Sequence, residues 1–394
     1  RYPADWPDDG RCGDTAAPKD ESPLKMSTRP LPRWIDVGLL PLLNLLAALI
    51  VAGIIIAIIG ENPFVAMGVM IKGAFVYKGA LGYTLFYTTN FIFTGLAVAV
   101  AFHAMLFNIV GEGQAMIGGL WVGLLVLMLD VVLPPVVVLL LAVPAAASFG
   151  AVWGVIPGWL QARRGSHIVI TTIMFNFIAS SIMVWLLAGM LMAPGQMSPE
   201  TRSFAEGVNL PKIYELLQMA GFAVAKSPLN LSFVVALLAC FGVWYLIWRT
   251  KLGYIIRATG HSERAAVYAG HDPAKIIMIA MAISGGLAGL MSLNEILGVQ
   301  QRVILNFTSG YGFTGIAVAL MGRNHPVGIV LASLLFGALY QGGAELDFEF
   351  QTITREMVLM IQGLIILFSG ALAYLFTPTV ARLYFRFVSP QEAR

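Results

Sequence analysis

The sequence predicts an all-α polytopic membrane protein, and three observations lead to this fold class. Of the 394 residues, 58% are hydrophobic and 11% are charged, with a mean hydropathy of +0.81. Many uncharged stretches reach about 18 residues or more, the length that an α-helix needs to cross a bilayer. From Ser27 on, the segments expected on the cytoplasmic side hold 13 Lys/Arg and 5 Asp/Glu, against 7 and 10 outside. This asymmetry predicts about ten transmembrane helices with cytoplasmic N- and C-termini.

Each expected crossing is an apolar run bounded by a charged, Gly-containing or Pro-containing turn. We expect crossings over Val37–Gly60, Tyr83–Ala104, a stretch ending near Leu129, one ending at Gln161, Ile168–Met192, Leu229–Trp248, Ile276–Asn294, Tyr311–Met321, Pro326–Gly343 and Met357–Thr377. Some are short or broken, and Tyr311–Met321 has the length of a half-helix. External segments are expected at Glu61–Gly82, Ala193–Ser227, Glu295–Gly310 and Ala344–Glu356.

The chain divides into one membrane domain and two terminal segments. Residues 1–35 are expected to form a disordered cytoplasmic segment, and the Asp- and Pro-rich part from 1 to 25 is typical of a leader or an added segment before Met26. The transmembrane domain is expected over residues 36–381, with a polar loop at 251–275, and the cytoplasmic tail over 382–394.

The loop Lys251–Lys275 is the large polar exception between two apolar spans. Ser262 is placed as a helix N-cap, Glu263 stands in the first turn, and Gly270 can take the left-handed conformation that ends a helix after Ala269. Asp272-Pro273 then starts the next helix. A capped basic helix at the membrane surface favours a docking element for a soluble partner, and a solvated linker is the alternative.

Two glycine-bearing segments resemble each other. FTGLAVAV (Phe93–Val100) recurs as FTGIAVAL (Phe313–Leu320), which indicates two related halves of a transporter-like fold unless the similarity is due to chance. The second copy begins in GYGFTG (Gly310–Gly315), which lacks the strand context of a dinucleotide site. We interpret it as a broken helix whose N–H groups face a cavity.

Polar side chains within the spans are the candidates for a solute path, because such residues are costly in lipid. They are Asn90, Asn108, Glu112, Gln114, Asn176, Asn294, Gln300 and Gln341, with Phe175 and Tyr311 beside them. Each could equally form a hydrogen bond between helices.

Composition and motifs argue against other functions. The net charge of +3 is too small to indicate nucleic-acid binding, and Cys12 and Cys240 suggest neither a disulfide framework nor a metal site. The five histidines lack metal-ligand spacing, and no HExxH, GxSxG or phosphate-binding GxxxxGK[ST] motif occurs. We therefore expect no catalysis, no metal and no ATP hydrolysis by this chain alone.

Four segments together resemble the membrane permease subunits of bacterial ABC importers, in the branch for ribose-type sugars and nucleosides. They are FNIVGEGQ (Phe107–Gln114), GSHIVITTIMFNFIA (Gly165–Ala179), ATGHSERAAVYAGHDPAK (Ala258–Lys275) and GYGFTGIAVALMGRNHPVGIVLASLLFGALYQGG (Gly310–Gly343). The resemblance covers about Arg33 to Phe385 and extends more distantly to branched-chain amino-acid permeases. The family often has NIGAEGQ where this chain has Val110 and Gly111, a small departure that should leave the helix break intact.

The resemblance implies a complex in the bacterial inner membrane. A periplasmic binding protein would deliver a nucleoside or simple sugar, two permeases, here different chains, would form the path, and ATP-binding subunits would use ATP and Mg²⁺. A secondary transporter, or a permease for another small polar solute such as a branched-chain amino acid, is the alternative.

The resemblance and the local patterns together give three sets of candidate residues. The solute path would involve Asn90, Asn108, Glu112, Gln114, Phe175, Asn176 and Tyr311. Coupling to the ATPase would involve Ser262, Glu263, Arg264, Ala265, Ala266, Tyr268, Ala269 and Gly270. The binding protein would dock on Ala193–Ser227 and Ala344–Glu356, through Glu200, Arg202, Glu345, Asp347 and Glu349, with Glu206 and Lys212 nearby.

Overall fold

The computed structural model describes residues 32, 35, 39–350, 352–367, 380–381 and 384, and every regular element in this part of the chain is helical. The terminal segments predicted at 1–35 and 382–394 lie almost entirely outside the described residues. The elements are α1 (Leu40–Ile59), α2 (Pro63–Phe75), α3 (Ala80–His103), α4 (Gly111–Leu129), α5 (Pro135–Arg164), α6 (Ile168–Gly189), α7 (Ile213–Met219), α8 (Ser232–Arg249), α9 (Lys251–His261), α10 (Glu263–Tyr268), α11 (Pro273–Ser292), the π-helix η2 (Leu293–Gln300), α12 (Tyr311–Met321), α13 (Pro326–Glu349) and α14 (Arg355–Ile366).

The described residues contain fewer helices of membrane-spanning length than the ten that the sequence predicts. Within the described residues, 7 helices meet the length and hydropathy that a crossing requires, or up to 8 if the bent pair α1 and α2 forms one span. This pair bends by 119°, where Asn62 caps α2 and Pro63 begins it. α12 is a short apolar helix of 11 residues, as its length predicted. The second half of the expected crossing Met357–Thr377 lies outside the described residues.

The prediction that Glu295–Gly310 is external was wrong at its beginning. α11 continues through η2, so that Pro273–Gln300 forms one apolar span of 28 residues. Glu295 is buried in this span, 5% exposed, and accepts a hydrogen bond of 2.7 Å from the side-chain amide of Asn90 in α3. The π-helical winding widens the helix at the point where Asn294 and Glu295 both face inward.

Close helix packing at glycines builds the centre of the bundle. A Cβ atom on Gly285 or Gly289 of α11 would overlap the backbone of α5 at Gly150 and Ala146. The Gly-x-x-x-Gly pattern of α11, Gly285 and Gly289, therefore serves close packing against α5. α3 is the most enclosed of the long helices, since 83% of the residues in its most apolar stretch are buried. In α5, α6 and α8 the corresponding share is only 22–28%. The latter three helices lie on the outside of the bundle.

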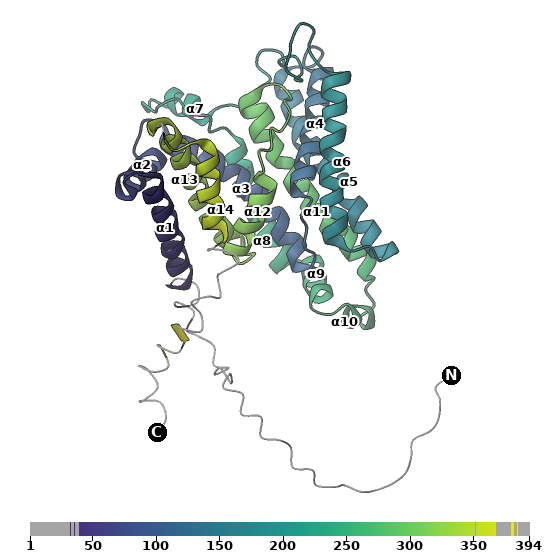
Figure 1. Cartoon of the computed structure of the whole chain (residues 1–394). Coiled ribbons are helices and arrows are strands. Elements are labelled where there is room, and N and C mark those ends of the chain that lie inside the picture. The colour runs from purple at the N-terminus through teal and green to yellow at the C-terminus, as the bar shows by residue number, and fades with distance from the viewer. Residues whose placement is uncertain are drawn as a thin grey trace, which may run out of the picture.

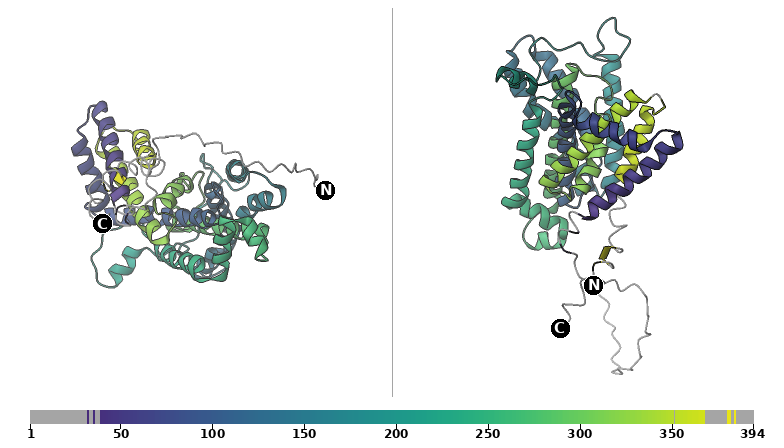
Figure 2. Two further views of the ribbon diagram at one scale, coloured as in Figure 1. Left: turned by 90° about the horizontal axis from the view of Figure 1, so that it is seen from below. Right: turned by 90° about the vertical axis from the view of Figure 1, so that its left-hand side faces the viewer.

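The two predicted polar regions lie at opposite ends of the bundle. The long loop after α6 and the short helix α7 stand at one end, and α9 and α10 stand at the other (Figure 1). α1 and α2 flank the bundle beside α13 and α14, and both views in Figure 2 place them at its edge. This arrangement agrees with the predicted separation of the loops Ala193–Ser227 and Lys251–Lys275.

The local structure of the loop Lys251–Lys275 follows its sequence. The Ser262 hydroxyl accepts a hydrogen bond from the Ala265 N–H at 3.3 Å, and Asp272 accepts one from the Ala274 N–H at 3.0 Å. Gly270 takes the left-handed conformation with φ +81°. Ala266, one of the predicted coupling residues, is 1% exposed, so its side chain packs within its own chain. Its role in coupling stays a prediction.

The two similar segments pack against each other. A Cβ atom on Gly95 would come within 3.0 Å of Val318, and one on Gly315 would overlap the Thr94 side chain. The first segment lies inside the 24-residue α3, whereas the second makes up most of α12. The relation between two halves of the fold stays a prediction.

Candidate functional site

A cavity of about 670 Å³ lies where α4, α6, α12, α13 and α14 meet beside α3. Two helices contribute residues three or four positions apart, which lie on one side of a helix. They are Ile173, Asn176, Phe177 and Ser180 of α6, and Tyr340, Gly343, Ala344 and Asp347 of α13. The other lining residues are Tyr87, Glu112, Met116, Asn306, Ser309, Gly310, Tyr311, Phe313, Val358, Leu359 and Gln362. The cavity therefore combines aromatic, amide, hydroxyl and carboxylate groups.

Glu112 joins the starts of two helices at the wall of this cavity. It stands in the first turn of α4, and its carboxylate accepts hydrogen bonds from the N–H groups of Gly310 at 2.9 Å and Gly312 at 2.7 Å, and from the Thr308 hydroxyl. The backbone donors at the start of α12 are thus satisfied by a negative side chain, the arrangement favoured at a helix N-terminus. A Cβ atom on Gly312 would overlap the Glu112 backbone, which explains the glycine there.

Asn176 holds the start of α4 from the side of α6. Its Oδ1 accepts a hydrogen bond from the Gly113 N–H at 2.9 Å, and its Nδ2 donates one to the Ile109 carbonyl at 2.9 Å. Val110, which departs from the family pattern, precedes α4 without disturbing the break between α3 and α4. Asn176 consequently has a structural role, and it also lines the cavity.

Three tyrosines from separate helices gather at the wall of the cavity. The ring centroids of Tyr311 and Tyr340 are 5.8 Å apart, those of Tyr87 and Tyr340 also 5.8 Å, and those of Tyr87 and Tyr311 6.4 Å. Phe91 packs edge-on behind Tyr311 and Tyr340, at 5.5 and 5.0 Å. These rings provide aromatic surface next to polar groups, as in a small-molecule site.

Of the predicted path residues, Glu112, Asn176 and Tyr311 meet at this cavity, and four others lie elsewhere. Asn108 donates to Ser284 at 2.7 Å and to Gln114 at 3.2 Å, inside the packing of α4 and α11. Asn90 bonds with Glu295 and Asn294. Phe175 points away from the cavity toward Trp153 of α5, with ring centroids 5.3 Å apart. It lies about 100° around α6 from Asn176 and does not belong to the cavity lining.

Sequence reasoning missed several functional candidates. Tyr87, Tyr340 and Gln362 line the cavity, and the spacing of four residues along α13 could have revealed Tyr340. It also missed a buried polar chain in which Asn294 accepts from Asn230 at 2.8 Å and from Ser232 at 2.7 Å, and donates to Asn90 at 2.8 Å. This chain connects α3 and η2 with the start of α8.

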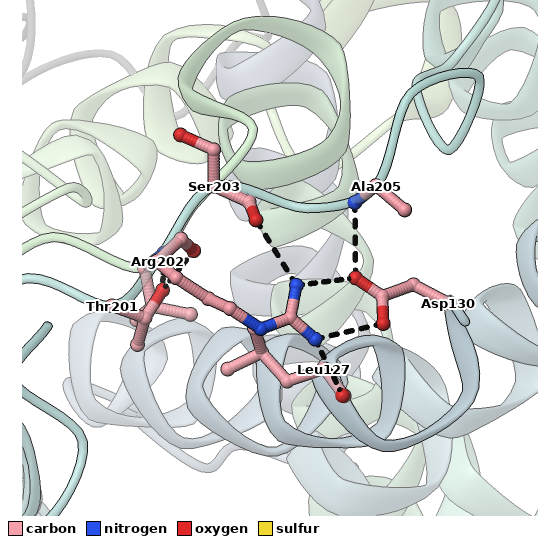
Figure 3. A network of polar contacts seen from close by, with 7 residues as sticks. Leu127, Asp130, Thr201, Arg202, Ser203 and Ala205 are labelled. Carbon is pink, nitrogen blue, oxygen red and sulfur yellow. Dashed lines mark hydrogen bonds and ion pairs between the residues drawn. The ribbon is translucent and has the colours of Figure 1, made fainter.

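The predicted docking residues are held by contacts within the chain. Arg202 forms two hydrogen bonds with the Asp130 carboxylate, at 2.7 and 2.8 Å, and Asp130 also accepts from the Ala205 N–H at 3.0 Å (Figure 3). The pKa of Asp130 is lowered below its ordinary value, mainly because its carboxylate accepts these hydrogen bonds from Arg202. Glu200 pairs with Arg302 at 2.8 Å. These pairs tie the loop after α6 to the turn after α4 and to the segment after η2.

The acidic residues predicted between Ala344 and Glu356 are on a helix, since α13 extends to Glu349. Their side chains have different surroundings. Glu345 accepts a hydrogen bond from the Gln341 amide at 3.0 Å, and Asp347 lines the cavity. The external position of Ala344–Glu356 stays a prediction, with its first part, up to Glu349, in helical conformation.

A family of transport proteins matches most of this sequence. Residues 80–370 match the family described as branched-chain amino acid transport system / permease component, and they include α3 to α14 with the cavity. This chain belongs to that permease family. It is 36% identical to the guanosine ABC transporter permease protein NupP of Bacillus subtilis, over 84% of this chain and 92% of that protein.

Further members of the permease family are similar over most of their length. The glucose ABC transporter permease protein TsgB13 of Haloferax volcanii is 32% identical, over 86% of this chain and 88% of its own. The nucleoside ABC transporter permease protein NupB of Lactococcus lactis is 30% identical, over 84% and 90%. The membership confirms the resemblance inferred from the sequence motifs and identifies this chain as a transport component of the ABC permease type.

Proposed function

We propose that the chain is the membrane-spanning permease of an ATP-driven importer and forms the path for a nucleoside or simple sugar. The observation that carries this proposal is the cavity that places three tyrosine rings beside Glu112, Asp347 and the amides of Asn176 and Gln362. Aromatic rings stack on a nucleobase or on the apolar face of a sugar, while carboxylate and amide oxygens accept hydrogen bonds from hydroxyl groups.

The lining favours a neutral, hydroxyl-bearing solute over a branched-chain amino acid. Among the described residues, its charged side chains are the two acids Glu112 and Asp347, and the carboxylate of an amino acid would face them at close range. The start of α12, which could attract a carboxylate, already binds Glu112. Similarity to permeases named for guanosine, nucleosides and glucose supports the same solute class.

The proposed complex contains other subunits. The complex would lie in the inner membrane of a bacterium. A periplasmic binding protein would deliver the solute at the end of the bundle that carries the loop after α6. A second, different permease and ATP-binding subunits that use ATP and Mg²⁺ would complete the complex. In this arrangement α10, between α9 and α11, is the coupling helix that transmits ATPase motion to the spans.

The test is uptake by proteoliposomes that contain the complete complex and its binding protein. We expect a labelled nucleoside or ribose to accumulate with ATP, and leucine not to compete. Uptake that continues after removal of the ATP-binding subunits would show a secondary transporter, and leucine uptake would contradict the proposed solute class.

Two variants of Tyr340 separate a nucleoside from a sugar. Tyr340→Phe keeps the ring and should leave nucleoside uptake within about twofold, whereas Tyr340→Ala removes a stacking partner and should raise the KM roughly fivefold to tenfold. If Tyr340→Phe impairs uptake as strongly as Tyr340→Ala, the hydroxyl rather than the ring recognises the solute, and a sugar is favoured.

A further inference from the structure

A second pocket, distinct from the cavity above, lies at the junction of α8 and α9. It has a volume of about 490 Å³ and is lined by Trp248, Arg249, Thr250, Lys251, Tyr254, Ile255, Arg257 and His271. Three of these side chains are Arg or Lys. Within the described residues, none of these three takes part in an ion pair. Such a pocket attracts an anion with several acceptor oxygens.

Arg257 supplies the clearest sign of a missing partner. Its Nε atom is buried and has no hydrogen-bond partner among the described residues. A buried guanidinium donor without an acceptor is costly, and an oxygen of a bound anion would satisfy it. The start of α9 lies at the same pocket, where the Thr250 hydroxyl accepts a hydrogen bond from the Gly253 N–H at 3.1 Å and caps the helix.

The pocket is rigid on the side of the bundle. The Trp248 ring lies between His103, at 5.2 Å between ring centroids, and His325, at 5.0 Å. α9 turns back closely against α8, since a Cβ atom on Gly253 would overlap the backbone of Leu246 and Ile247. The Trp248 ring and the turn between α8 and α9 are therefore in place before a ligand binds, which lowers the cost of binding.

The surroundings indicate which anion occupies the pocket. The outer side of α8 carries an apolar stripe, Val234, Leu238, Phe241 and Tyr245, whose exposed fractions are 42–64%. With helical spacing this stripe ends at Arg249, and Arg249 lies over the Trp244 ring at 5.3 Å. Tyr254, 64% exposed, stands on the next helix. Tyr and Trp at the end of an apolar span are typical of the level of lipid headgroups.

We propose that this pocket binds the phosphate headgroup of an anionic phospholipid whose acyl chains lie along the outer side of α8. The phosphate would accept hydrogen bonds from Arg257 and from Arg249 or Lys251, and Tyr254 would lie at the level of the glycerol. Since α9 leads directly into α10, a bound lipid would fix the base of the proposed coupling helix. The site itself does not depend on the proposed solute.

The test is native mass spectrometry of the purified complex titrated with phosphatidylglycerol or phosphatidylcholine. We expect preferential binding of phosphatidylglycerol, and a loss of about 30-fold in its apparent affinity in the double variant Lys251→Gln/Arg257→Gln, about fivefold for each charge. The matched control Lys72→Gln/Lys78→Gln removes two exposed charges near α2 and should bind as wild type. If the double variant does not fold, Lys251→Gln alone, at an exposed position, should show the fivefold loss.

Three results would overturn the proposal. One is unchanged phosphatidylglycerol binding in the Lys251 and Arg257 variants. Another is displacement of the lipid by soluble glycerol 3-phosphate at similar concentration, because the site would then take a free phosphate. The third is a double variant Lys251→Gln/Arg257→Gln that binds phosphatidylglycerol as wild type but no longer retains the ATP-binding subunit. This result would show that the pocket is a protein-docking surface instead.

Discussion

The carboxylate of Glu112 accepts a hydrogen bond of 2.7 Å from the backbone N–H of Gly312, 200 residues further along the chain. This contact joins the first turn of α4 to the first turn of α12 at the wall of the cavity. A residue that sequence reasoning placed in the solute path thus also determines where a broken helix begins. The position of the Tyr311 ring, next to Gly312, depends on this contact.

We expect Glu112→Ala to destabilise the protein by about 2–5 kcal/mol, because two backbone N–H groups and the Thr308 hydroxyl lose their acceptor. Glu112→Gln keeps one acceptor oxygen and should cost less. Thermal unfolding in detergent measures both, with the exposed Glu263→Gln as the control. An unchanged midpoint in Glu112→Ala would show that Glu112 does not hold α12.

The ion pair of Asp130 and Arg202 should make the loop after α6 sensitive to acid. Hydrogen bonds from Arg202 lower the pKa of Asp130 in the folded protein, so the pair stabilises fully above the unfolded pKa of about 3.9 and is lost as the pH falls through the folded pKa. We expect Asp130→Asn to cost about 1–3 kcal/mol at neutral pH, and this difference from wild type to shrink below about pH 4.

Proteolysis of the loop and thermal unfolding across this pH range measure the effect of Asp130→Asn. Glu206→Gln, an exposed change in the same loop, serves as the control and should behave as wild type at all pH values. A difference between Asp130→Asn and wild type that grows as the pH falls would contradict the lowered pKa of Asp130.

Asn176→Leu should impair assembly and transport together. The variant leaves the Gly113 N–H and the Ile109 carbonyl without their partner, at about 1–3 kcal/mol for each group. Ser180→Ala changes the same side of α6 and should assemble normally. Size-exclusion chromatography and uptake assays are the measurements, and an Asn176→Leu complex that assembles fully but does not transport would show a direct solute contact instead.

For the coupling helix, the exposed Tyr268 is a better test position than the buried Ala266. Tyr268 is 92% exposed, so Tyr268→Ala should lower the ATPase stimulation by loaded binding protein without changing the unfolding midpoint. Tyr77→Ala, at another exposed position, is the control. Equal ATPase stimulation in Tyr268→Ala and wild type would show that this side chain does not transmit the motion.

Gly270→Val tests the end of the same helix. Gly270 has φ +81°, a conformation that costs an L-residue about 1–2 kcal/mol, so the variant should redirect α11. We expect it to retain solute capture from the binding protein but to lose stimulated ATP hydrolysis. Full stimulation in the reconstituted Gly270→Val complex would mean that the loop is only a linker.

The fold class and the local helix signals could be predicted because each is encoded within a few residues. Apolar length marks the long spans, and Ser262, Gly270 and Asp272 form the caps that their residue types favour. Of the ten expected crossings, three are not among the seven long apolar helices of the described residues: α1 forms a pair with α2 that bends by 119°, α12 has 11 residues, and the second half of Met357–Thr377 lies outside the described residues. The count of ten stays a prediction.

The site was predictable only in part, since its lining depends on contacts between distant helices. Glu295 stands in a polar stretch that resembles a loop, and only the approach of Asn90 from α3 and the π-helical winding make it part of a span. Phe175 and Asn176 are neighbours in sequence, yet Phe175 packs on Trp153 of α5 whereas Asn176 lines the cavity. Aromatic or polar character alone did not reveal which side of each helix faces the cavity.

The central proposal is that the solute passes through the cavity of α4, α6, α12 and α13, and two neighbouring serines on α6 test it most directly. Ser180 lines this cavity, whereas Ser181 is exposed but lies about 100° further around the helix, outside the lining. We expect Ser180→Trp to fill the path and lower nucleoside or ribose uptake at least tenfold, with ATPase activity retained, and Ser181→Trp to transport as wild type. Wild-type uptake in Ser180→Trp, or an equal defect in both variants, would contradict the proposal.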